Sequence, residues 1–183
     1  AKACQQQQIH TIGVTAGYIN PVARREFFQY MDAVNVDLKA FNEAFYWKLN
    51  GAHLQPVLDT MIYIHHETQV WLEFTTLLIP GENDSTDEIN QMTKWLVQNL
   101  GTDVPLHFSA FHPDWKMLDH PPTPPATLSR AREIALANGL NYVYTGNVHD
   151  KTGSSKYCSK CGQLLIGRDW YELSDCHLDP QGW

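Results

Sequence analysis

The chain has few cationic side chains: 13 Lys and Arg stand against 20 Asp and Glu, and the formal net charge is −7. Nucleic acids and anionic membrane surfaces are bound through clustered Lys and Arg, so we expect neither as a partner. The sequence also lacks a run of 18 apolar residues and the charged-then-apolar N-terminus of a secretion signal. We therefore expect no membrane span and a cytoplasmic location.

Cysteine is scarce too, with four in 183 residues, but two of them form a motif. Cys158 and Cys161 belong to a CxxCG knuckle, and two thiolates at this spacing can hold one tetrahedral zinc. Cys176, which follows Cys161 after fourteen intervening residues, or the adjacent His177 could complete the shell. The alternative is a reduced, metal-free pair. We expect residues 151–183 to be a zinc-ribbon-like tail, cut short at its end.

An initiator Met is absent as well. The chain begins with Ala1, and residues 1–8 (AKACQQQQ) are typical of the last turns of a helix. We expect a piece of a longer protein; a processed or tagged terminus is the alternative.

What the sequence does contain is a regular alternation of apolar runs and helical periodicity. Strands that are separated by helices at this spacing are predicted to pair in parallel, through right-handed crossovers. The length suits one domain, and five strands are too few for a closed eight-stranded barrel. We expect an α/β fold, a partial parallel (β/α) barrel over residues 1–150, with a doubly wound sheet as the alternative. The predicted strands are 9–16, 33–39, 70–79, 104–111 and 141–145, and the predicted helices are 21–31, 54–68, 85–99 and 126–138.

Alternation along the predicted strands gathers polar side chains on one face. Barrel interiors are usually apolar, and unpaired charges buried there cost several kcal/mol each, so a polar interior favours a site for a polar ligand. The alternative is a network in which Asp37 pairs with Lys39 and Glu73 with His107. His112 follows just after the fourth strand. The polar set on this face is Asp37, Lys39, Glu73, His107, Thr145 and, beyond the last strand, Asn147.

Long stretches of the chain resemble one enzyme family. They include residues 14–18 (VTAGY), 33–41 (AVNVDLKAF), 71–85 (WLEFTTLLIPGENDS), 104–117 (VPLHFSAFHPDWKM) and 123–150. With residues 157–173 they are similar to the radical S-adenosylmethionine (SAM) enzymes related to pyruvate formate-lyase activating enzyme, and in particular to the radical SAM member of the AmmeMemoRadiSam system.

That resemblance implies a [4Fe–4S] cluster and SAM as cofactors, with reductive cleavage of SAM to a 5′-deoxyadenosyl radical in the intact protein. It implies that Thr15 and Asp37 lie near the SAM carboxylate, that Lys39 lies close to SAM, and that His112 approaches its adenine or ribose. Glu73 stands where the family tends to have a basic residue. The family's CxxxCxxC cluster motif is missing from these residues, so we expect the chain by itself to be inactive.

Two other functions stay open. The chain could be a non-catalytic barrel module that binds a small polar ligand or a protein partner. It could also be a metal-dependent hydrolase that uses Asp37, Glu73, His107 and His112, although no HExxH pattern supports this. An incomplete barrel exposes apolar strand edges, so we expect the chain to self-associate. The substrate cannot be read from these residues.

Overall fold

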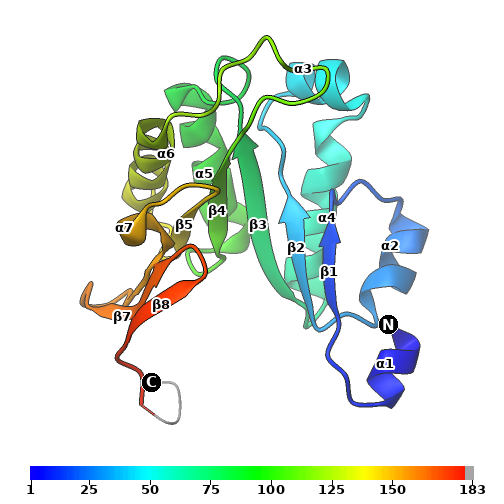
Figure 1. Ribbon diagram of the computed structural model, residues 1–183. Helices are drawn as coiled ribbons and strands as arrows, with labels where there is room; N and C mark the ends of the chain where they lie inside the picture. The colour runs from blue at the N-terminus through cyan, green and yellow to red at the C-terminus, as the bar shows by residue number, and fades with distance from the viewer. Residues whose placement is uncertain (180–183) are drawn as a thin grey trace.

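A computed structural model describes residues 1–179 and shows a sheet of five parallel strands (Figure 1). The strands are β1 (Ile12–Thr15), β2 (Ala33–Asp37), β3 (Trp71–Leu78), β4 (Leu106–Ala110) and β5 (Val143–Gly146). They lie in the order β1-β2-β3-β4-β5, so each strand pairs with the next one along the chain. A doubly wound sheet would reverse direction at a switch point, and this sheet has none. The partial parallel barrel is therefore confirmed.

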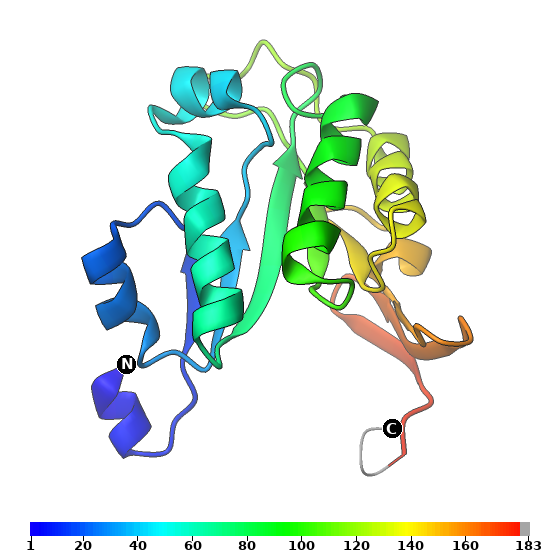
Figure 2. The same cartoon turned by 180° about the vertical axis from the view of Figure 1, so that it is seen from behind.

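The helices cover one face of the sheet, as Figure 2 shows from behind. Two begin at residues suited to capping: the Asn20 side chain accepts from the backbone N–H groups of Val22 and Ala23, and the Ser85 hydroxyl accepts from that of Glu88. The predicted helices are confirmed to within a few residues. The helices are α1 (Lys2–Gln6), α2 (Pro21–Phe28), α3 (Glu43–Phe45) with the π-helical turn Tyr46–Asn50, α4 (Leu54–Glu67), α5 (Thr86–Leu100) and α6 (Pro125–Ala137).

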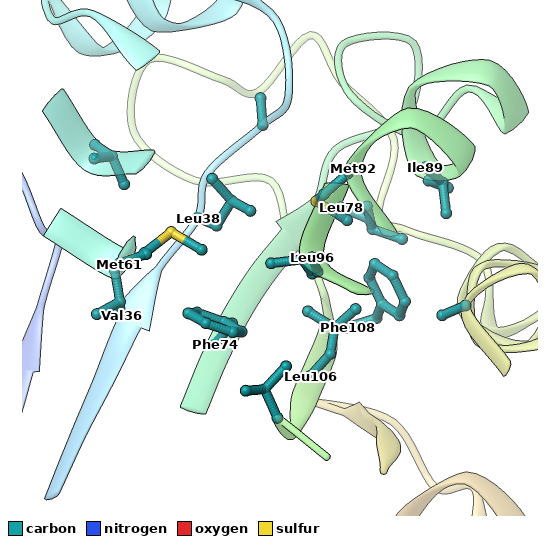
Figure 3. Close-up of a cluster of buried hydrophobic side chains, with 14 of the residues drawn as sticks. Val36, Leu38, Met61, Phe74, Leu78, Ile89, Met92, Leu96, Leu106 and Phe108 are labelled. Carbon is teal, nitrogen blue, oxygen red and sulfur yellow. The ribbon is translucent and has the colours of Figure 1, made fainter. Parts of the chain in front are cut away.

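The hydrophobic core lies between this helical layer and the covered face of the sheet (Figure 3). Alternate strand residues supply the sheet side of the core, as the two-residue period of a strand requires. Fully buried examples from the strands and helices are Val36, Phe74, Leu78, Phe108, Met61 and Leu96. The remaining strand residues therefore belong to the opposite face.

That opposite face is left open by the main helices and is the interior of the partial barrel (Figure 1). On it, Ile12 and Val14 of the edge strand β1 are 73% and 77% exposed. Exposed apolar residues on an unpaired strand edge favour association, and self-association stays a prediction.

A second, antiparallel sheet follows β5, with the order β6-β7-β8. It comprises β6 (Lys156–Tyr157), β7 (Leu164–Asp169) and β8 (Glu172–Cys176), preceded by the short helix α7 (Lys151–Ser154). The Thr145 hydroxyl donates to the Asp150 carboxylate at 2.9 Å, which ties α7 to β5. The predicted tail extends to residue 183, so its last four residues lie outside the described part. Across residues 1–179, no helix is long and apolar enough to cross a membrane.

Candidate functional site

The DLK segment at the carboxyl end of β2 places opposite charges side by side. Lys39 Nζ lies 2.6 Å from Asp37 Oδ2, and the two side chains are 37% and 29% exposed. This is the pairing of Asp37 with Lys39 that the alternative, a self-satisfied network, predicted. Both side chains remain accessible from the open face. Each can therefore give up its contact with the other and bind the opposite charge of an amino-acid zwitterion.

Neighbouring elements fix the backbone of this segment. The Lys39 N–H donates to the Tyr46 hydroxyl at 3.1 Å, and the buried Asn83 amide donates to the Lys39 carbonyl at 2.7 Å. The Thr76 hydroxyl donates to the Leu38 carbonyl at 2.8 Å. Burial raises the pKa of Tyr46 to about 12, so its phenol stays neutral. Sequence patterns missed Asn83; the only signal was an Asn in a turn after a buried strand.

Thr15 and His112 also stand at the carboxyl ends of strands, but neither joins the Asp37–Lys39 pair in a contact. Thr15 is in register with Val36, which is buried beneath the helices, so Thr15 and Asp37 do not share a face. Its hydroxyl accepts from the Gly17 N–H at 3.1 Å and shapes the turn after β1. His112 is exposed beyond β4 and has no hydrogen bond among the described residues.

Lower on the open face, Glu73 of β3 and His107 of β4 form the second pair of that alternative network. Glu73 Oε2 lies 3.1 Å from His107 Nε2, and the Trp71 indole N–H donates to Glu73 Oε1 at 2.9 Å. The hydrogen bond to His107, followed by that from Trp71, lowers the pKa of Glu73 despite partial burial. Glu73 is therefore an ionised acceptor that orients the His107 ring.

Strand β5 departs from the prediction. Tyr144, not Thr145, is in register with His107, and its ring stacks on the imidazole with centroids 5.1 Å apart. Thr145 is in register with Phe108 and is buried on the helical side. Val143 and Thr145 are buried on the face that the helices cover, where α6 and α7 contact β5, whereas Tyr144 is half-buried on the open face. Burial, and after it the Glu73 charge, raises the pKa of Tyr144.

The predicted metal sites are not formed within the described residues. The described residues contain no group of three or more His, Cys, Asp or Glu side chains that could hold a metal. Cys176 pairs with Ile166 in the second sheet and does not complete a site with the CxxC pair, nor do the four residues of the hydrolase hypothesis form one. Backbone N–H groups of Cys161 and Lys160, and then the Cys161 thiol, lower the pKa of Cys158.

Known proteins share this fold. No protein-family model matches the chain. An uncharacterized protein of Methanocaldococcus jannaschii is 39% identical over 177 residues, which are 97% of this chain and 52% of that protein. The chain thus spans about half the length of this curated relative.

Two solved structures resemble it in fold. One is a domain of a pyruvate-formate lyase-activating enzyme from Bacteroides vulgatus, with a TM-score of 0.69 and 16% identity over 80% of this chain and 86% of that one. The other is a radical SAM methyltransferase from Sphaerobacter thermophilus, with a TM-score of 0.62 and 18% identity over 86% and 46%. The fold is thus that of the partial barrel found in radical SAM enzymes.

Proposed function

We propose that this chain is part of a radical SAM enzyme of the activating-enzyme type, and that its open face binds the amino-acid end of SAM. The observation that carries the proposal is the accessible pair of Asp37 and Lys39 on a fixed backbone at the carboxyl end of β2. In open α/β sheets, ligands bind outside the carboxyl ends of the strands.

The donor set suits that group. The Asp37 carboxylate matches the α-ammonium of SAM, and Lys39 matches its α-carboxylate, so ligand binding would open the pair that the two side chains form with each other. His112, just beyond β4, would border the adenosine, and Thr15 would order the turn beside the site. With a [4Fe–4S] cluster held outside this chain, SAM supplies the 5′-deoxyadenosyl radical when it is cleaved reductively.

We leave Glu73 and His107 out of this SAM site, so their predicted SAM contact stays a prediction. The Glu73 carboxylate already engages His107 Nε2 and the Trp71 indole N–H, and both residues lie towards the amino ends of β3 and β4. A zinc ion on Cys158 and Cys161 would need two further ligands from outside the described residues. We also propose that the boundary between the partial barrel and the tail lies near residue 150.

Equilibrium dialysis with SAM tests the site. Asp37→Asn and Lys39→Met should each weaken SAM binding about 10- to 100-fold, as loss of a charged hydrogen bond does. Asp59→Asn and Lys94→Met remove the same charges from exposed helical positions and should change nothing. 5′-Methylthioadenosine, which lacks the amino-acid moiety, should bind all variants equally. Equal loss of both ligands, or of neither, contradicts the proposal.

The second candidate is a non-catalytic module that binds a small polar ligand. One observation favours it: the open face carries a separate cleft beneath the second sheet. Measuring 5′-deoxyadenosine from SAM and dithionite in the full-length, cluster-reconstituted protein separates the two candidates, because only the enzyme forms it.

A further inference from the structure

The second sheet and the open face of the barrel enclose a cleft of about 530 Å³. Its volume lies in the range of sites for small molecules. One wall is formed by the amino-terminal halves of β3 and β4 together with β5 and the residues that follow it, and the other is the second sheet, seen at the lower left of Figure 1. The groups that matter for recognition are Glu73, His107, Tyr144, Lys156, Arg168 and Trp170.

The cleft carries a surplus of positive charge in an acidic protein. Lys156 and Arg168 line it from the second sheet, and neither makes an ion pair within residues 1–179. Its lining carboxylate, Glu73, is already engaged by His107 and Trp71. The Lys156 ammonium lies 5.7 Å from the centroid of the Tyr142 ring and attracts the Glu73 carboxylate. Lys156 and Arg168 together still outnumber this one lining carboxylate, and a net positive cleft favours an anionic ligand.

Aromatic surfaces lie beside these cations. Tyr144 stacks on His107, and Trp170 stacks on His149 with centroids 5.4 Å apart. Trp170 and Trp71 remain 46% and 57% exposed, although large apolar side chains are normally buried. Flat exposed rings that are held in place by their neighbours suit a planar ligand.

His107 adds an oriented hydrogen-bonding group. Its Nε2 lies against the Glu73 carboxylate, which is ionised and can only accept, so the tautomer that fits this contact carries its proton on Nε2. Nδ1 has no hydrogen bond within the described residues and is then an acceptor. A ligand with an N–H or O–H group on its ring could donate to it.

We propose that this cleft binds a small planar anion: an aromatic or heteroaromatic ring that carries a carboxylate or phosphate. Its anionic group is held by Lys156 and Arg168, its ring lies against Tyr144 and Trp170, and a ring donor faces His107 Nδ1. The site is separate from the SAM site proposed above and does not depend on it.

Calorimetric titration with two matched pairs of probes tests this site. Indole-3-carboxylate is compared with neutral indole-3-carboxamide, and phenyl phosphate with phenol, because neither pair carries the adenosine that the proposed SAM site would bind. Native protein should bind at least one anion at millimolar or better affinity and at least about tenfold more tightly than its neutral twin. The pair that shows this preference tells a carboxylate ligand from a phosphate ligand.

Variants locate the binding. Arg168→Gln and Lys156→Gln should each lower the affinity for the anion about tenfold and leave the affinity for its neutral twin unchanged. Lys94→Gln, on exposed α5, is the matched control and should have no effect, and circular dichroism confirms that each variant is folded. Asp37→Asn should also leave the probes unaffected, so failure here and failure of the SAM site are told apart. Neutral twins that bind as well, a Lys94→Gln effect of equal size, or no binding below about 10 mM would overturn the proposal.

Discussion

Replacing Asn83 with Ala should destabilise the whole sheet, although Asn83 lies in a turn. Its side chain is almost fully buried and makes three hydrogen bonds: it donates to the carbonyls of Lys39 and Leu77, and it accepts from the Ile79 N–H. Truncation leaves these three backbone groups without that partner. At about 1 kcal/mol for each, the free energy of unfolding should fall by about 3 kcal/mol. For a domain of this size that corresponds to about 6–12 °C in Tm.

Urea denaturation measures this change, with Gln98→Ala as the control, because Gln98 is an exposed amide on α5. The control should stay within about 0.5 kcal/mol of the native protein. Asn83→Asp keeps an oxygen that accepts from the Ile79 N–H, but its second oxygen faces the carbonyls of Lys39 and Leu77, to which it cannot donate. It should therefore lower the free energy of unfolding at least as much as Asn83→Ala. If the free energies of unfolding of Asn83→Ala and Gln98→Ala differ by less than about 0.5 kcal/mol, the Asn83 turn does not anchor Lys39.

Three further predictions follow from other parts of the chain. Gly153→Ala should lower the Tm measurably by scanning calorimetry, because a Cβ there would overlap the Thr145 hydroxyl. Hydrogen bonds to Glu82, and then to Asp119, raise the pKa of His120 above 6.5, so the stabilisation by His120 is complete below about pH 6.5 and is lost as the pH rises through the raised pKa. The Tm difference between native protein and His120→Gln should therefore shrink as the pH rises over that range, and a difference that grows would contradict this prediction. Cys158 should react with iodoacetamide at a lower pH than an ordinary thiol, as read by mass spectrometry, and an ordinary alkaline midpoint would contradict its lowered pKa.

Strand alternation predicted the sheet well because the covered face selects apolar residues at every second position. It correctly placed Asp37, Glu73 and His107 together on the uncovered face. It failed in β5, where Tyr and Val both count as apolar and the pattern alone could not tell which one meets the helices. Which of the two meets the helices is set by how β5 packs against α6 and α7, and a local pattern does not contain that tertiary packing.

The cleft could not be predicted from sequence for a related reason. Lys156, Arg168 and Trp170 belong to the second sheet, and nothing in their local pattern says that this sheet lies across the open face. Asn83 is a similar case, because its three partners are brought together by the fold, and one of them, Lys39, lies 44 residues away in the chain. Motif reading finds neighbours within a strand, whereas these groups meet only after the chain has folded.

The nucleotide sequence that precedes the codon for Ala1 tests most directly whether the chain is part of a radical SAM enzyme. If it is, we expect an in-frame CxxxCxxC motif after a predicted strand within about 150 codons, the length that further βα units and a leader would take. An open reading frame that begins at Ala1, or one that carries no such cysteines upstream, would contradict it and favour the ligand-binding module.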